Sequence, residues 1–73
     1  MQDNKKPVVT IEQWEVILDS ENKFRLTGKV YSHPKFTDGT TVCTTEILKY
    51  IEEAMMYETV NTYYSLGEPK EEV

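Results

Sequence analysis

Residues 24–31 carry the most regular pattern in the chain, and they constrain its fold more than any other segment. Apolar or small side chains occupy every second position, which is the period of a half-buried β-strand. The positions between them hold Arg25, Thr27, Lys29 and Tyr31. Gly28 falls on the apolar face, where a glycine is typical of a bulge, a sharp bend or a close backbone approach. We therefore expect a bent strand whose apolar face packs inward.

Three further segments also indicate strands. Residues 13–18 alternate in the same way, and the turn-forming residues 19–22 predict a hairpin that joins them to residues 24–31. Residues 40–44 are rich in β-branched side chains. Residues 56–66 alternate again, which predicts one strand or a tight hairpin that turns near Asn61 and Thr62.

Residues 45–57 fit two kinds of structure. Their apolar side chains recur at the spacing of an amphipathic helix, at Ile47, Leu48, Ile51, Ala54 and Met55. The alternative is a strand in which Lys49 interrupts the apolar face. The spacing alone favours the helix.

The predicted fold class is therefore mainly β: a small, strongly bent antiparallel sheet or SH3-like barrel, with or without one short helix near residues 45–57. A chain of 73 residues supports one hydrophobic core, and we expect it within residues 10–67, between a flexible arm (1–9) and an acidic flexible tail (68–73). The single cysteine and single histidine cannot form an intramolecular disulfide or a zinc site. Association into a homo-oligomer is the expected additional support.

Charge and cysteine usage narrow the partners and the compartment. The net charge of −5 argues against binding to a nucleic acid polymer, which needs a positive field. One cysteine, no apolar run of membrane-spanning length and a polar start predict a protein of the cytoplasm that does not enter a membrane. We expect Cys43, among β-branched residues, to be a small buried hydrophobe.

The basic residues concentrate where the acids are missing. Residues 22–37 contain no Asp or Glu but include four lysines and arginines. A strand face with Arg25, Lys29 and Tyr31 is suited to a phosphorylated ligand that contains a ring, because arginine binds phosphate bidentately and tyrosine stacks. The alternative is an ordinary solvated strand face. The candidate ligand-binding residues, including those just beyond the strand and the one tryptophan, are Trp14, Arg25, Lys29, Tyr31, His33 and Lys35.

Catalysis has little support in this sequence. His33 is the only imidazole, and no spacing selects a serine or Cys43 as its nucleophilic partner. The adjacent carboxylates Glu52 and Glu53 are typical of a solvated face, and the three glycines form no phosphate-binding loop. We predict a protein that is not an enzyme and carries no cofactor or metal, in which His33 closes its loop by hydrogen bonding.

Five short motifs follow one another along the chain: Leu26–Val30, His33–Pro34, Asp38–Gly39, Thr44–Thr45 and Thr59–Gly67. Together they resemble a family of short bacterial and phage β-domain proteins with the pattern L-x-G-x-V, H-P, D-G, T-S/T and T-x-N/S-x-x-Y-x-L-G. The resemblance covers residues 14–67, and none of its motifs is catalytic.

The resemblance implies a small curled β-sheet, in which residues 45–56 are partly extended. Small phage-encoded oligomers of this general kind include proteins that sequester the signalling nucleotides of bacterial immune systems without cleaving them. By this analogy the chain is expected to be a phage-type binding protein that counters bacterial defence by holding a phosphorylated ligand. The alternative is a small adaptor or inhibitor that binds a host protein through its aromatic and acidic surface.

Overall fold

The first two strands form the predicted hairpin in the computed structural model, which describes residues 6–71. β1 (Val8–Leu18) and β2 (Phe24–Tyr31) pair antiparallel. Their turn is held by Asp19, whose Oδ1 accepts hydrogen bonds from the backbone N–H groups of Glu21 (2.8 Å) and Lys23 (3.0 Å). Asn22 takes the left-handed conformation that this turn needs, with φ of 63°.

The prediction of an α-helix near residues 45–57 is wrong. β3 (Thr40–Ile51) runs through the first half of that segment, and only the single 3-10 turn η1 (Glu52–Ala54) follows before β4 (Met56–Thr59). β3 pairs with β2 on one side and β4 on the other, so backbone pairing with distant residues outweighs the local helical spacing. Ile47 and Leu48 are adjacent apolar residues and so break the strict alternation of a strand. The register of β3 and β4 shifts between Ile47 and Lys49, which accounts for this break.

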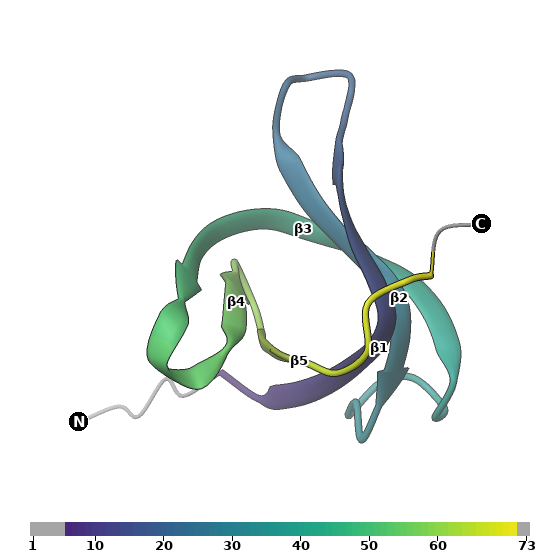
Figure 1. The fold of residues 1–73 in the computed structure, drawn as a ribbon. Helices are drawn as coiled ribbons and strands as arrows, with labels where there is room; N and C mark the ends of the chain where they lie inside the picture. Colours follow the sequence, from purple (N-terminus) through teal and green to yellow (C-terminus); the bar gives the residue numbers. More distant parts are fainter. Residues whose placement is uncertain (1–5, 72–73) are drawn as a thin grey trace.

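The last strand closes the sheet into a barrel. β5 (Tyr63–Leu66) forms a hairpin with β4, which is one of the two alternatives that the sequence leaves open for residues 56–66, and also pairs with the start of β1. The strand order β1-β2-β3-β4-β5 is that of a closed barrel, shown in Figure 1. Because successive strands reverse direction and their number is odd, β5 runs parallel to β1, with Val8 opposite Tyr63 and Ile11 opposite Leu66. The predicted small, mainly β barrel is confirmed.

A bulge in β1 bends the hairpin against the barrel. The register of β1 and β2 shifts between Glu12 and Glu15, and Gln13 adopts a φ of 53°. Gly28 lies opposite this bulge, and a Cβ atom there would stand only 2.8 Å from the carbonyl oxygen of Glu12. Of the three alternatives that the sequence leaves open at Gly28, the structure shows a close backbone approach.

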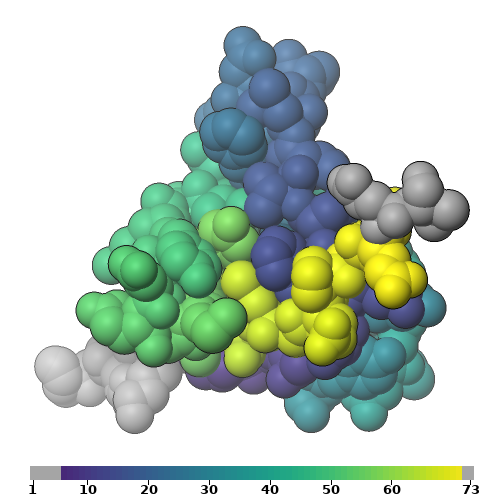
Figure 2. Space-filling model, viewed as in Figure 1, coloured from purple at the N-terminus to yellow at the C-terminus, as the bar shows by residue number. Residues whose placement is uncertain are grey.

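The core is small and lies where the strands cross. Its buried apolar side chains come from β1, β2 and β5, and they are Val9, Ile11, Leu26, Val30 and Tyr64. Phe24, at the start of the same strand face, is 55% exposed because the hairpin extends beyond the barrel. Figure 2 shows this hairpin as a separate projection from the body of the molecule. The apolar face of β2 thus packs inward from Leu26 onward only.

The folded part extends past both expected domain boundaries. Lys6 forms an ion pair with Glu58, and Val8 already belongs to β1. After β5, the backbone oxygen of Glu68 accepts a hydrogen bond from Gln13 N–H (2.6 Å), so this segment binds along β1. The rest of the expected arm and tail, residues 1–5 and 72–73, lies outside the described residues. Within residues 6–71, no helix has the length and apolar character needed to cross a membrane.

Candidate functional site

The loop between β2 and β3 is closed by its own side chains. Asp38 Oδ1 accepts a hydrogen bond from Ser32 N–H (2.8 Å), and Gly39, with φ of +89°, donates its N–H to the carbonyl of Val30. His33 Nδ1 accepts a hydrogen bond from Lys35 N–H (2.9 Å), and its ring packs edge-on against Phe36 with centroids 4.7 Å apart. The predicted role of His33 in closing this loop is confirmed.

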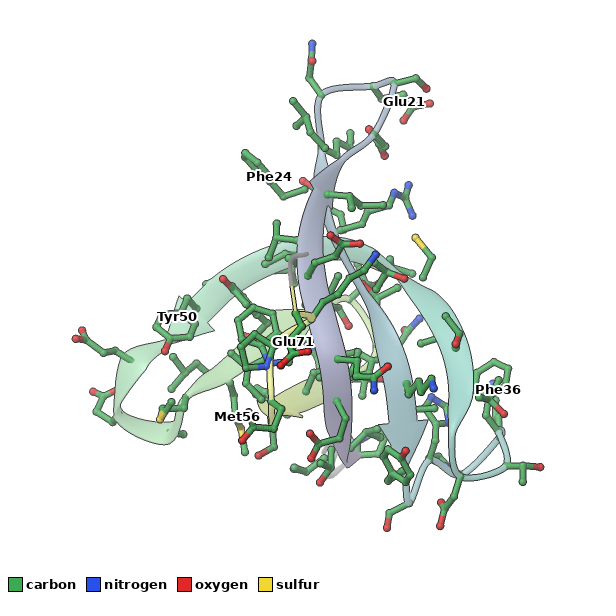
Figure 3. The ribbon with its side chains drawn as sticks, turned by 45° about the vertical axis from the view of Figure 1, so that its right-hand side comes forward. Glu21, Phe24, Phe36, Tyr50, Met56 and Glu71 are labelled. Carbon is green, nitrogen blue, oxygen red and sulfur yellow. The ribbon has the colours of Figure 1, made fainter. Side chains whose placement is uncertain are left out.

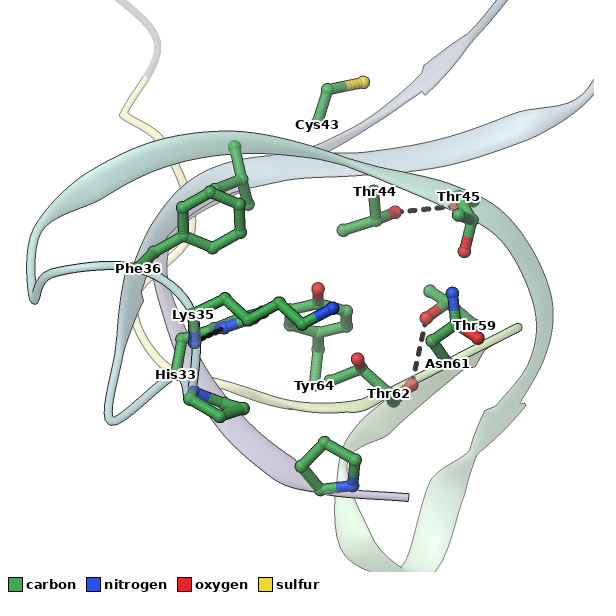
Figure 4. A pocket seen from close by; sticks show the side chains of 13 residues that line it. His33, Lys35, Phe36, Cys43, Thr44, Thr45, Thr59, Asn61, Thr62 and Tyr64 are labelled. Atoms are coloured by element: carbon green, nitrogen blue, oxygen red, sulfur yellow. Dashed lines mark hydrogen bonds between the residues drawn. The ribbon is translucent and has the colours of Figure 1, made fainter.

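This loop forms one wall of a pocket at an open end of the barrel, with a volume of about 480 Å³. Two other segments and Pro7 complete it: residues 42–45 of β3, and Thr59, Asn61, Thr62 and Tyr64 at the corner between β4 and β5. Figure 4 shows the side chain of Lys35 reaching across the opening, with Tyr64 and Thr62 below it and Phe36 beside it. Three segments and Pro7, which are distant from one another in the sequence, therefore face one cavity, which we call the mouth pocket.

Hydroxyl groups line the deepest part of the mouth pocket. Thr44, Thr59, Thr62 and Tyr64 are all buried. The Thr59 hydroxyl donates to the backbone oxygen of Thr62 (3.0 Å), and that of Thr44 donates to the backbone oxygen of Thr45 (2.7 Å). The pKa of Tyr64 is raised above its ordinary value, because the effect of burial exceeds the opposing effect of a hydrogen bond with Thr62. With its pKa raised, the Tyr64 phenol stays protonated at neutral pH and adds no negative charge.

The charge of the mouth pocket is positive. None of its lining residues is an aspartate or glutamate, and Lys35 supplies a cation. Burial, and to a smaller extent the charge of Lys35, lowers the pKa of His33. The neutral ring that results accepts at Nδ1 and has an N–H left at Nε2. In a chain of net charge −5, the lining of this pocket thus combines one cation with hydroxyls and contains no carboxylate.

The six candidate residues do not share one surface. His33 and Lys35 line the mouth pocket. Arg25, Lys29 and Tyr31 lie together on the other face of β2, as their alternation predicts. Trp14 is half-buried against the core, where its Nε1–H donates to the backbone oxygen of Gly67 (3.0 Å).

On the outer face of β2, the charge of Arg25 is bound to partners within the chain. Arg25 Nε binds Asp19 Oδ2 at 2.6 Å, and Arg25 Nη1 binds the backbone oxygen of Thr44 at 3.0 Å. The bond from Arg25 holds the pKa of Asp19 down to about 2. Lys29 lies between Glu12 on β1 and Thr41 on β3. Of the two cations that the sequence places on this face, Arg25 is paired with an acid, and Lys29 has Glu12 as its neighbour in the strand register.

Cys43 lies on the same outer face, opposite Thr27 of β2, and is exposed. Figure 4 shows its side chain pointing away from the mouth pocket. The expectation that it is a buried hydrophobe is therefore wrong. Residues 40–44 alternate as a strand, and the inward positions of that strand are taken by Val42 and Thr44.

The sequence did not single out the hydroxyl side of the mouth pocket. Thr44, Thr59, Asn61, Thr62 and Tyr64 belong to it. A signal was present, because all five occur in the motifs Thr44–Thr45 and Thr59–Gly67 that carry the family resemblance. The nearest ends of the two motifs, residues 45 and 59, are 14 residues apart in the sequence. Their positions on the two sides of one pocket follow from the closure of the barrel, which the sequence alone does not reveal.

No protein-family model, no curated protein and no solved structure matches this chain. The case for a function therefore rests on the geometry and chemistry of the mouth pocket.

The loop around His33 should make stability depend on pH. Since the pKa of His33 is lowered in the folded protein, folding favours the neutral ring, and the unfolded chain binds the proton more readily. The resulting stabilisation should be complete above the ordinary histidine pKa of about 6.5. It should be lost as the pH falls through the lower folded value.

Urea unfolding at neutral pH and at mildly acidic pH would measure this dependence. His33→Asn keeps a side-chain acceptor for Lys35 N–H but cannot be protonated, so it should remove the difference between the two conditions. An unchanged difference in this variant would assign the pH dependence to other groups.

Proposed function

We propose that this protein is a non-enzymatic binding protein that holds a small phosphorylated ligand in the mouth pocket. The observation that carries the proposal is the composition of that pocket: a lysine, a histidine, hydroxyls and one amide converge there without any carboxylate. Phosphate oxygens are acceptors only, and they bind best where charged and neutral donors meet. The pocket volume lies within the range of sites for small organic molecules.

Each side of the pocket has a separate part in this proposal. Lys35 and the Nε2–H of His33 would meet the phosphate at the rim. The hydroxyls of Thr45 and Thr62 and the amide of Asn61 would bind polar groups of the remaining moiety, and Phe36 offers an aromatic face at the opening.

The proposal excludes turnover for a chemical reason. His33 uses Nδ1 to accept the N–H of Lys35 and packs its ring against Phe36, so its lone pair is not free to act as a base. The hydroxyls of Thr44 and Thr59 donate to backbone oxygens instead of a base. We propose binding and sequestration on this basis.

We further propose that the ligand is a signalling nucleotide and that its sequestration counters bacterial defence. This part rests on the resemblance to small phage proteins. The phosphate and ring of a nucleotide match the cationic rim and the aromatic side chain of the mouth pocket.

Calorimetric titration with cyclic and linear nucleotides, and with inorganic phosphate as the minimal anion, would test the proposal. Lys35→Ala should weaken the binding of a phosphorylated ligand about tenfold, because it removes one charge-assisted contact worth roughly 1.4 kcal/mol. Lys29→Ala is the matched control, since it removes the same charge from the outer face of β2 and should leave the affinity unchanged. Failure of every ligand to bind, or equal losses in both variants, would refute the site.

A second candidate function, an adaptor that binds a host protein, has its own observation. Tyr50 and Tyr57 pack with ring centroids 5.0 Å apart, and the exposed Glu52 and Glu53 follow Tyr50 at η1. Aromatic side chains next to acids suit a basic partner surface. A pull-down that returns one stoichiometric partner, released by salt and lost in E52K/E53K, would favour this function over ligand binding.

A further inference from the structure

We propose that two copies of this chain form a twofold dimer in which the projecting hairpin of each copy packs on the aromatic side chains of the other. The contact uses two surfaces of the same chain. The first is the hairpin arm, made of Val16, Leu18 and Phe24. The second is the aromatic base, made of Trp14, Tyr50 and Tyr57. This inference is independent of the proposed ligand.

The hairpin arm continues the strand face that forms the core of the barrel, but among the described residues its own side chains are exposed. Val16 pairs with Leu26 and Leu18 pairs with Phe24, so these side chains share the face on which Leu26 is fully buried. Beyond the barrel the same face is open, and Leu18 and Phe24 are 56% and 55% exposed. A monomer gains nothing from extending this apolar face into water, whereas a partner would bury it.

The edges of the hairpin are open as well. Among the described residues, β5 pairs with β1 only as far as Ile11, and the bridge from Pro69 reaches only Trp14. On the other side, the pairing of β2 with β3 begins at Arg25. An isolated two-stranded ribbon is marginal in water, so packing against a second copy would stabilise it.

The aromatic base continues the same surface onto the barrel. Trp14 precedes Val16 by two residues on β1, and its ring meets that of Tyr57 edge-on with centroids 6.2 Å apart. Tyr57 in turn packs against Tyr50, which is 46% exposed. Figure 3 shows Phe24 pointing from the hairpin to the side of the molecule on which Tyr50 lies. Arm and base therefore form one bent apolar surface.

A second copy is the occupant that this geometry favours. In a twofold contact the arm of each copy packs on the base of the other, so the arm and the base of both copies are buried. Two pairs of charges near the arm are already matched within the chain, because Asp19 is paired with Arg25, and Lys23 lies 3.6 Å from Glu46. The four most exposed side chains of arm and base would contribute roughly 400 Å² per copy, about half of what each partner supplies in a standard interface. We expect micromolar affinity, with a polar rim around this centre.

Sedimentation equilibrium over a range of protein concentrations is the first test. The wild-type protein should reach twice the mass of the chain, and its melting temperature should rise with concentration. Leu18→Asp should sediment as a monomer at every concentration with an unchanged circular dichroism spectrum. Val60→Asp is the control, since it places the same charge on an equally exposed apolar residue at the turn between β4 and β5.

Photo-crosslinking identifies the contact itself. With Phe24 replaced by p-benzoylphenylalanine, irradiation should link the hairpin to residues 50–57 of a second copy. A wild-type protein that stays monomeric, a dimer that survives Leu18→Asp, or crosslinks outside residues 14 and 50–57 would each overturn the proposal. Capture of a different protein at Phe24 in place of a second copy would overturn it as well.

Discussion

Gly28→Ala is expected to lower the free energy of unfolding by about 3 kcal/mol, a large fraction of the stability of so small a domain. The new Cβ would lie 2.8 Å from the carbonyl oxygen of Glu12 and 3.0 Å from the Cα of Trp14. Both are backbone atoms, so no rotation of a side chain relieves the overlap. Strand β1 would have to move away at its bulge, where the projecting hairpin and the barrel join. Urea denaturation followed by circular dichroism measures the loss.

Gly39→Ala provides the contrast. The space around Gly39 is open, and its nearest contact would be the Tyr31 hydroxyl at 3.9 Å. The only penalty is the positive φ of +89°, which costs an alanine about 1 kcal/mol. Equal losses in the two variants would show that β1 does not approach Gly28 closely.

Thr44→Val should lower the free energy of unfolding by about 2 kcal/mol, although the two side chains have nearly the same shape. The Thr44 hydroxyl accepts a hydrogen bond from the buried N–H of Leu26 (3.1 Å), where the ladder between β2 and β3 shifts register. Valine leaves that N–H without a partner and away from water.

Thr44→Ser separates the hydrogen bond from the packing. It keeps the hydroxyl and loses only a methyl group, so we expect a loss of about 1 kcal/mol or less in the same urea denaturation experiment. If valine proved less destabilising than serine, the register shift would not depend on the hydroxyl of Thr44.

The local sequence pattern was sufficient to predict the structure where a strand pairs with the strand next to it in the chain. The alternation of residues 24–31 predicts β2 and its two faces. Asp19 lies at the expected turn, and Gly28 lies opposite the bulge of β1. The strand character of residues 56–66 was predicted for the same reason, with a hairpin as one of two alternatives. Turn chemistry and a period of two act over a few residues, so they can be recognised in the chain itself.

Features that depend on distant pairing could not be predicted in this way. The spacing of Ile47 and Ile51 favoured a helix, but β3 gains backbone partners on both sides only once the barrel closes. The candidate site shows the same limit. The cationic stretch led to Arg25 and Lys29, whereas the position of Glu12 opposite Lys29 is visible only in the strand register. Thr59 joins Lys35 in the mouth pocket through the closure of the sheet.

The central claim is that the mouth pocket, and not the outer face of β2, binds a phosphorylated ligand. The most direct measurement is an amide NMR titration of the wild-type protein with the nucleotide that binds tightest in calorimetry. The account predicts shifts concentrated in residues 33–36, 42–45 and 59–64. Shifts concentrated at Arg25, Lys29 and their neighbours on β1 and β3, with residues 59–64 unchanged, would contradict it.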